Sequence, residues 1–453
     1  MAEVWPFAGT RYQTKENGLN LADALAPPFD DISPELQKLL HEAHQHNIVR
    51  LTLGNEAPSD DEINNRYTRS AECYREWKAA GILTDEQRKC FYVYEQEFVP
   101  PGAKKPVKRL GFFALVKLQD FRSGKTRSFQ MTYEGPKMDR LKLLRTTQIN
   151  PSALFMLYKD DEKEIEQVLS EVMDKKEPIE EFQDAQGMTH RLWLMHKKDP
   201  ILRIHDAMKP KRLFIAHGHH RYETALKYRD EMREMTGRRD GRQPFDFVLM
   251  YLQRAEDETL FTRPVHRVLA RELGLDVDLD EIVEDLEEFF TVTEFKVNMK
   301  DPEKAAKAIE DKLKATRAAK TRFVMTLPTG RSYQLSLKKD ADLDDMIDEE
   351  TMSETLKAMD PIILHHYIIT KGWIGNPDIE LDEDDIFYRK DIAESLQLLA
   401  KRKGCVGFFM NPLSKEDALS IAENGELLPY NSVDFFPKLP SGIVLRDLQV
   451  GFG

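Results

Sequence analysis

Residues 213–225 read Leu-Phe-Ile-Ala-His-Gly-His-His-Arg-Tyr-Glu-Thr-Ala. The apolar run Leu213–Ala216 predicts a short buried strand, and the segment Tyr222–Met235 predicts a helix that ends near Gly237. Gly218 lies between the two, where a residue without a side chain permits a tight turn. A strand that leads through a glycine turn into a helix favours a fold of mixed α/β class.

The same turn carries the residues with the clearest chemistry. A helix start offers backbone N–H groups and the positive end of the helix dipole, which favour an anion. Arg221 adds a rigid fork that matches two phosphate oxygens, and His219 and His220 add donors whose charge changes near neutral pH. Glu223 can orient a neighbouring side chain or bind a metal. The pattern predicts phosphate binding, while a metal site and a purely structural polar cap remain open alternatives.

A second cluster of charges lies upstream, in residues 134–140. It reads Glu-Gly-Pro-Lys-Met-Asp-Arg and places two carboxylates and two cations around a predicted proline turn. Such a turn can help to hold a phosphate and its metal ion. A solvated loop whose charges begin a helix is the alternative interpretation.

The flanking sequence predicts a sheet with helices around it. Phe91–Phe98 alternates aromatic and polar residues, as a strand does, and Leu110–Leu118 is its predicted hairpin partner. Glu162–Met173 has apolar residues at helical spacing, and Phe245–Leu252 is a further strand-like run. The first part of the chain therefore predicts one α+β core, which we place at residues 1–270.

The pattern changes after residue 270. Leu279–Phe290 has helical spacing, and Phe323–Leu327 and Tyr333–Leu337 flank a Pro-Thr-Gly turn that predicts a hairpin. We therefore expect an inserted or second α+β unit at 271–345. We expect the C-terminal α/β part, 346–453, to pack back on the core.

Composition restricts the class of protein. The chain has 453 residues, with 66 Lys and Arg against 79 Asp and Glu, so its formal net charge is -13. This charge makes nucleic-acid binding unlikely. Three cysteines without metal or disulfide spacing, no signal peptide and no membrane-length apolar run predict a cytoplasmic protein without a membrane partner. The oligomeric state cannot be read from the sequence.

Five segments resemble the signatures of a bacterial and archaeal family, "domain of unknown function 1015". These segments are 27–33, 135–141, 150–158, 216–226 and 436–439. They occur in the same order as in the family and are spread along nearly the whole chain. The Gly218–Arg221 turn is similar to the phosphate-binding turn of the ParB, sulfiredoxin and free-serine-kinase superfamily. This resemblance implies a ParB/sulfiredoxin-like core with a strand–turn–helix phosphate site.

The resemblance also implies an activity, a small-molecule phosphotransferase that converts free serine to O-phosphoserine. The donor would be ATP, ADP or pyrophosphate, and Mg²⁺ is the expected metal, held by Asp139 or Glu134. The general base would be His217 or Glu223, with His219 and His220 as further catalytic residues. The expected phosphate ligands are Gly218, His219, His220, Arg221, Lys137 and Arg140.

The sequence departs from the family pattern at three places. The family usually has Asp where this chain has His217, and a His-Glu pair where it has Phe129-Gln130. The late Pro-Gln-Lys-Ser-Thr element reads Pro-Tyr-Asn-Ser-Val at 429–433. Because a kinase depends on carboxylates near the transferred phosphate, the alternative is a non-catalytic regulatory protein that binds a nucleotide or phosphate.

Overall fold

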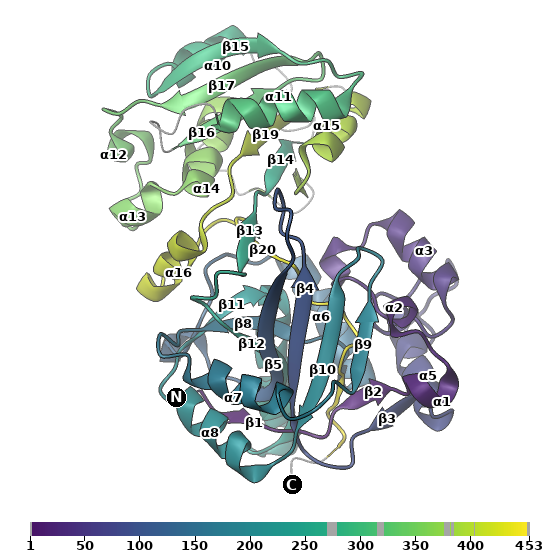
Figure 1. Ribbon diagram of the computed structural model, residues 1–453. Coiled ribbons are helices and arrows are strands. Elements are labelled where there is room, and N and C mark those ends of the chain that lie inside the picture. Colours follow the sequence, from purple (N-terminus) through teal and green to yellow (C-terminus); the bar gives the residue numbers. More distant parts are fainter. Residues whose placement is uncertain are drawn as a thin grey trace. The chain divides into compact units, whose positions relative to one another are not determined.

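The structure, a computed structural model, describes residues 2–269, 279–314, 321–375, 381, 385–402 and 404–450. The chain folds into two units (Figure 1). Unit 1 contains Met1–Ser128, Glu134–Phe261 and Pro437–Gly453. Unit 2 contains Phe129–Tyr133 and Thr262–Phe436. The elements combine helices with sheets of mixed strand direction, which confirms the predicted α+β class.

This division differs from the three parts expected from the sequence. The expected boundary between 270 and 271 lies outside the described residues. Within 346–453, the stretch up to Phe436 belongs to unit 2, and only Pro437–Gly453 belongs to unit 1. Strand pairing explains the difference, because β19 (Val406–Met410) lies between two strands of the unit 2 sheet.

A nine-stranded sheet forms the framework of unit 1. Its order is β6-β11-β8-β12-β5-β4-β10-β9, and β1 pairs with β5. Strands β4 and β5 pair antiparallel, which confirms the predicted hairpin, whereas β12 runs parallel to β8. The strands are β1 Val4–Trp5, β4 Phe91–Phe98, β5 Val107–Lys117, β6 Thr126–Arg127, β8 Leu154–Tyr158, β9 Glu180–Gln183, β10 Thr189–Met195, β11 Leu213–His217 and β12 Phe247–Arg254.

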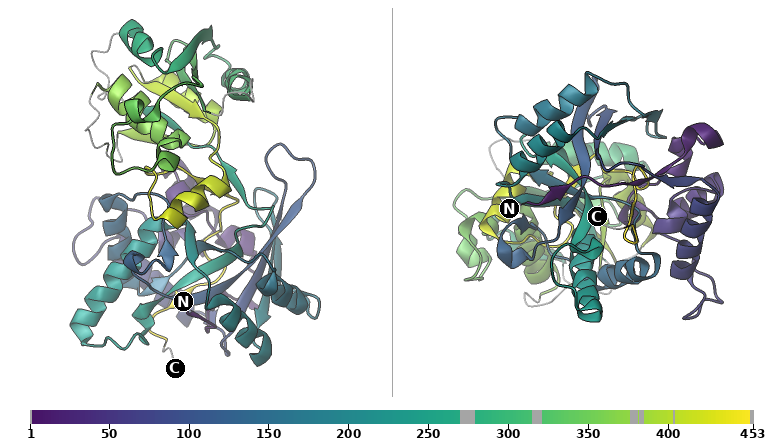
Figure 2. Two further views of the ribbon diagram at one scale, coloured as in Figure 1. Left: turned by 90° about the vertical axis from the view of Figure 1, so that its left-hand side faces the viewer. Right: turned by 90° about the horizontal axis from the view of Figure 1, so that it is seen from below.

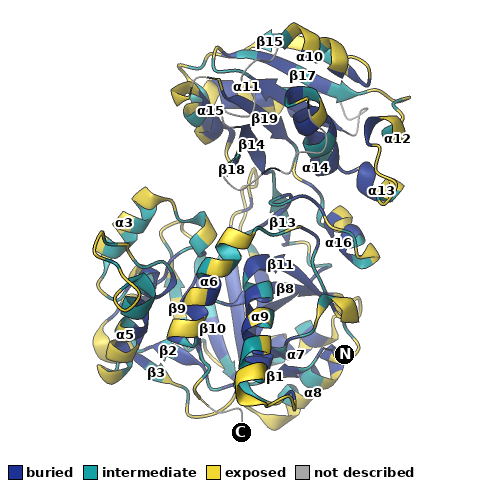
Figure 3. Cartoon of the chain, turned by 180° about the vertical axis from the view of Figure 1, so that it is seen from behind, coloured by how far each residue is buried: buried dark blue, intermediate teal, exposed yellow. Residues whose placement is uncertain are grey.

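Helices surround this sheet. Helices α7 and α8 pack against each other, and α6 and α9 lie side by side (Figure 3). The α-helices are α1 Thr14–Asn17, α2 Leu21–Ala24, α3 Pro34–Ala43, α4 Val49–Thr52, α5 Arg66–Ala79, α6 Glu134–Thr147, α7 Glu164–Met173, α8 Lys198–Met208 and α9 His219–Thr236. Short 3-10 turns lie at Phe29–Asp31, Phe121–Ser123 and Pro244–Asp246.

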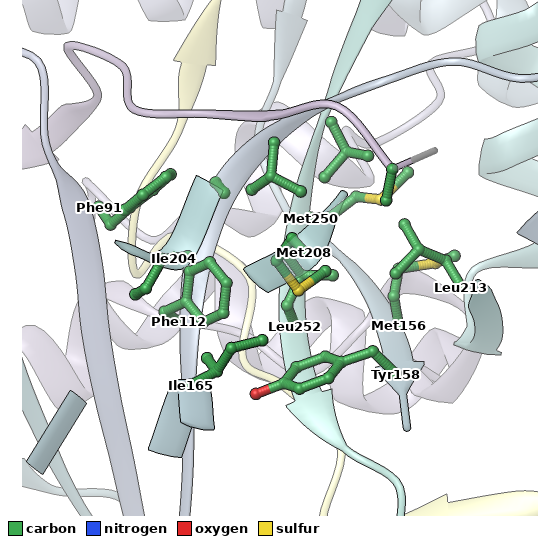
Figure 4. Close-up of a cluster of buried hydrophobic side chains, with 14 of the residues drawn as sticks. Phe91, Phe112, Met156, Tyr158, Ile165, Ile204, Met208, Leu213, Met250 and Leu252 are labelled. Atoms are coloured by element: carbon green, nitrogen blue, oxygen red, sulfur yellow. The ribbon is translucent and has the colours of Figure 1, made fainter. Parts of the chain in front are cut away.

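The core of unit 1 holds the strands that carry the site. Met250 of β12, Met156 of β8 and Leu213 of β11 are buried with Ile165 of α7 and Met208 of α8 (Figure 4). Alternate residues of a strand point to the same side, so each strand contributes every second residue to this cluster. Burial of each such side chain stabilises the fold by about 1.5–3 kcal/mol, and it fixes where β8 begins and β11 ends.

The C-terminal segment of unit 1 returns to the N-terminal part of the chain (Figure 2). Isolated bridges join Thr10 to Leu445 and Ala26 to Ser441. Two-stranded sheets complete this region: β2 (Thr10–Tyr12) with β3 (Leu83–Asp85), and β7 (Ile149–Asn150) with β21 (Arg446–Asp447).

Unit 2 contains a six-stranded sheet with antiparallel neighbours throughout its described strands. Its order, β15-β17-β16-β19-β14-β18, includes the predicted hairpin as β16 and β17. The strands are β14 His266–Leu269, β15 Phe290–Lys296, β16 Arg322–Thr326, β17 Arg331–Leu337, β18 Ile386–Arg389 and the β19 strand given above. The short strands β13 and β20 are Phe261–Arg263 and Asp434–Phe436.

The two faces of the unit 2 sheet are covered by different helices. Phe409 lies in an apolar cluster with α11 and α15, whereas its neighbour Phe408 contacts Trp373 of a π-helix. Since successive strand residues point to opposite faces, the π-helix covers the other side. The helices are α10 Leu279–Leu286, α11 Pro302–Lys314, α12 Leu343–Met346, α13 Glu354–Lys357, α14 Asp360–Ile362, the π-helix Ile363–Trp373, α15 Ile392–Lys401 and α16 Lys415–Asn424.

Candidate functional site

The turn between β11 and α9 forms as predicted, but the helix begins three residues earlier, at His219. Gly218 is its N-cap, with φ of 99° and ψ of 31°, in the left-handed region that favours glycine. A Cβ at this position would lie 2.7 Å from Leu154 Cδ2 and 2.8 Å from Arg221 Nη2. The missing side chain therefore makes room for the guanidinium of Arg221.

Arg221 is held by the protein itself. Its Nη1 donates to Ser152 Oγ at 2.8 Å and to the Ala153 carbonyl at 2.9 Å, and its Nη2 lies 3.3 Å from His217 Nδ1. Its Nε is buried without a hydrogen-bond partner among the described residues. Burial lowers the pKa of Arg221 to about 10, although the negative charge of Asp30 opposes this shift. The guanidinium of Arg221, which was predicted to hold phosphate, therefore joins the start of β8 to the turn.

His217 links Arg221 to a carboxylate. Its Nε2 lies 2.7 Å from Asp30 Oδ2. Because a guanidinium can only donate, Nδ1 accepts from Arg221 and Nε2–H donates to Asp30, which is the neutral tautomer. Burial lowers the pKa of His217 and outweighs the charge of Asp30. Asp30, His217 and Arg221 therefore form a hydrogen-bonded chain with a neutral imidazole in the middle.

Asp30 is ionised in this arrangement. Burial alone disfavours the charged carboxylate, yet the neighbouring His217 and Lys438 hold the pKa of Asp30 well below its usual range. Lys438 Nζ lies 3.2 Å from Asp30 and 3.0 Å from Asp31. A cation and a carboxylate thus stand beside the glycine turn.

The other two histidines of the turn are buried. Burial, with the neighbouring His217 and His220, holds the pKa of His219 well below its usual value. Burial lowers the pKa of His220 to about 4, although the charge of Asp30 opposes the shift. Both rings are therefore neutral near pH 7, so they can donate a hydrogen bond but bring no positive charge.

Lys137 connects the second charge cluster to the turn. Residues 134–140 form the start of α6, so the predicted proline turn is wrong. Proline fits the first turn of a helix because an N–H there has no partner within the helix. Lys137 Nζ lies 2.5 Å from Glu134 and 3.0 Å from Glu223 of α9. Glu223 therefore faces Lys137.

Asp139 and Arg140 lie apart from this contact. Asp139 Oδ1 accepts from Arg66 at 2.5 Å and from the Tyr67 hydroxyl at 2.8 Å, and its Oδ2 pairs with Arg140. Arg140 donates to the Thr52 carbonyl at 2.6 Å, and its guanidinium lies 4.1 Å from the centre of the Phe29 ring. Asp139 therefore joins α6 to α5, and Arg140 joins α6 to Thr52 at the end of α4.

The two carboxylates expected to bind Mg²⁺ do not fit a metal site. Both oxygens of Asp139 accept from cationic or hydroxyl donors, and Glu134 is 79% exposed and paired with Lys137. In the part of the chain that the structure describes, no group of three or more His, Cys, Asp or Glu is placed to hold a metal ion.

Three residues of the site were not among the predicted ones: Asp30, Ser152 and Lys438. Each lies far from the turn in sequence, and Asp30 is 187 residues from His217. A signal was present, because all three fall within segments that resemble the family signatures. The turn alone could not reveal them, since hydrogen-bond partners distant in sequence leave no local pattern.

The fold and the site define a mixed α+β protein with a strand–glycine–helix turn among ionisable side chains. The chain belongs to the family described as "Protein of unknown function (DUF1015)", whose sequence model matches residues 4–361. No curated protein matches the chain. None of the described helices is both long and apolar enough to cross a membrane.

Solved structures show only distant similarity. A conserved hypothetical protein from Pyrococcus furiosus is 12% identical, over 74% of this chain and 96% of its own, with a TM-score of 0.35. A free serine kinase in complex with AMP is 13% identical, over 74% and 90%, with a TM-score of 0.35. SbnI from Staphylococcus aureus, with a C-terminal truncation, is 11% identical, over 73% and 85%, with a TM-score of 0.33. With TM-scores this low, these structures assign neither a fold family nor a ligand to this chain.

Proposed function

We propose that the protein is a small-molecule phosphotransferase of the free-serine-kinase type. The observation that carries the proposal is the Asp30–His217 pair beside the Gly218 turn. It combines an ionised carboxylate and a neutral imidazole with the N-terminus of an 18-residue helix. Such a helix start attracts a phosphate, and an imidazole supported by a carboxylate is suited to accept a proton.

The transferred phosphate would lie at the first turn of α9. Backbone N–H groups at a helix start point outward along the axis. Lys137 and Lys438, whose side chains are 18% and 11% exposed, would supply positive charge. The neutral rings of His219 and His220 would donate hydrogen bonds to phosphate oxygens. Arg221 would act by positioning the turn, since its terminal nitrogens contact Ser152, Ala153 and His217.

His217 is the better candidate for the general base. Asp30 accepts from Nε2, which leaves Nδ1 as the basic atom. The acceptor oxygen would bond to the terminal phosphorus of the donor, and the bond from that phosphorus to the bridging oxygen would break. The hydroxyl proton would move to His217 Nδ1, displacing the contact with Arg221, and Asp30 would stabilise the resulting imidazolium. Glu223 is less suited because Lys137 pairs with it.

ATP, ADP and pyrophosphate are the candidate donors, and free serine is the acceptor that the family resemblance implies. We would incubate the protein with each donor and serine and measure phosphorylated product, and we would measure donor binding separately by calorimetry. We expect product with one donor. Absence of product with all three donors would contradict the proposal, and the calorimetry would then show whether a donor still binds.

The alternative function is binding of a nucleotide or phosphate without turnover. It is favoured by the contact of both His217 nitrogens with protein groups and by the absence of the carboxylate usual in the family. Donor binding without product from any small hydroxyl compound would support this alternative.

A further inference from the structure

One oxygen of the Asp30 carboxylate is open to a ligand. Among the described residues, this carboxylate contacts His217 Nε2 at 2.7 Å and Lys438 Nζ at 3.2 Å, and both contacts are made by Oδ2. Asp30 is an exposed residue whose side chain is 33% accessible, which leaves the other oxygen, Oδ1, to face solvent. Because a carboxylate accepts about four hydrogen bonds through its two oxygens, Oδ1 can accept one from a bound molecule.

This oxygen lies close to the candidate base. Asp30 Oδ2 contacts one nitrogen of the His217 ring, and the base is the other nitrogen, Nδ1. Oδ1 and Nδ1 are therefore separated by no more than the width of a carboxylate, one contact of 2.7 Å and the width of an imidazole ring. A molecule with a hydroxyl and a second hydrogen-bond donor on neighbouring carbons can reach both atoms at once, with hydrogen bonds of about 2.8 Å.

Negative charge exceeds positive charge beside this oxygen. Asp31 Oδ2 lies 3.0 Å from Lys438 Nζ, so Asp30 and Asp31 share one lysine. Both carboxylates are more exposed than Lys438, whose side chain is 11% accessible. Arg221 reaches Asp30 only through His217. A ligand group at Oδ1 therefore meets a field that attracts a cation and repels a further carboxylate.

We propose that Asp30 Oδ1 binds the ammonium group of the acceptor, and that the preferred acceptor is an amino alcohol without a carboxylate, of the ethanolamine type. This inference rests on the proposed phosphotransferase function. The ammonium group donates to Oδ1 while the hydroxyl gives its proton to His217 Nδ1. In serine, the carboxylate is on the carbon that bears the ammonium group, so it would lie beside Asp30 and Asp31, and Lys438 is already paired with both. Serine is then the weaker acceptor.

The first test compares three acceptors with the same donor. Ethylene glycol replaces the ammonium group of ethanolamine by a hydroxyl, and serine adds a carboxylate to ethanolamine. We expect kcat/KM for ethanolamine to exceed that for each of the others by about tenfold or more, because it alone combines a charged hydrogen bond with no repelled group. Equal or greater kcat/KM for ethylene glycol would overturn the ammonium contact, and equal or greater kcat/KM for serine would overturn the preference against a carboxylate. Either result would leave the phosphotransferase function intact.

The second test does not need turnover. Calorimetry measures ethanolamine binding to the wild type, Asp30→Asn and Asp85→Asn. Asp85 is the matched control, because its side chain is 34% accessible and pairs with Lys78. We expect about tenfold weaker binding to Asp30→Asn than to the other two proteins. No ethanolamine binding to the wild type, or equal binding to all three proteins, would overturn the inference. The expected binding without product from any donor would support the ammonium contact and count against the proposed function.

Discussion

At the scale of single residues, the site depends on a chain of three side chains, Asp30, His217 and Arg221. The sequence indicated two of them because they share one short turn. It did not indicate Asp30, although Asp30 lies in a segment that resembles a family signature. Asp30 reaches the site only because the Phe29–Asp31 turn lies against the end of β11, and such proximity has no periodic signature.

Acidification tests the buried state of His220. Its pKa of about 4 lies below the ordinary histidine value of 6.5, so between these values the unfolded chain binds a proton that the folded chain does not. The free energy of unfolding should therefore fall as the pH falls from 6.5 to 4, by up to about 3 kcal/mol from this residue.

His220→Gln should remove that share of the pH dependence, as measured by urea unfolding at pH 7 and pH 4.5. The groups that shift the pKa besides burial are Asp30, Lys137, His217 and Arg221, and all are retained in the variant. An unchanged difference between the two pH values would contradict the assignment of a buried neutral ring.

At the scale of elements, the strand–turn–helix of β11 and α9 was predictable from an apolar run, a glycine and helical spacing. The predicted start of α9 was three residues late because His219 and His220 are polar in the sequence but buried in the fold. The start of α6 was misread as a turn because proline is also common in turns. Patterns of neighbouring residues in the sequence therefore predicted that these elements exist. Where α9 begins depends on which polar residues the fold buries.

Glycine substitutions at the two ends of α9 separate the functional turn from an ordinary helix end. At Gly218 both the backbone and the close approach of Leu154 and Arg221 disfavour a side chain, whereas at Gly237 only φ, 69°, is unfavourable and nothing lies within 4 Å. Gly218→Ala should lower the free energy of unfolding by about 2–4 kcal/mol and Gly237→Ala by about 1 kcal/mol.

Urea unfolding measures both effects, and donor binding should weaken only in Gly218→Ala. Equal destabilisation by the two substitutions would show that the approach of Arg221 to the turn has no energetic weight.

At the scale of the whole molecule, the sequence predicted the mixed α+β class and more than one unit. It did not predict that the C-terminal α/β part is shared between the units. Val406–Met410 joins the unit 2 sheet, and Pro437–Gly453 belongs to unit 1 and brings Lys438 to Asp30. Which strand pairs with which depends on contacts between distant segments, so apolar runs alone cannot decide it.

Lys438 tests the role of the returning segment. Lys438→Gln should weaken donor binding by about fivefold, because a lysine beside the turn would contribute a charged contact to the phosphate. The matched control is Lys390→Gln, which removes a lysine paired at 3.2 Å with Asp434 in unit 2. Calorimetry of both variants checks this, and equal affinities would place Lys438 outside the site.

The most direct test of the central claim measures the phosphorylated product that the wild type, Asp30→Asn and Asp31→Asn each form from serine. Donor affinity is measured on the same samples. Both carboxylates contact Lys438, but only Asp30 contacts His217. We predict a loss of kcat of about 100-fold or more in Asp30→Asn, in the range of general-base catalysis, a small loss in Asp31→Asn, and similar donor affinity in all three proteins. Equal rates in the two variants, or donor binding without product in the wild type, would contradict the account.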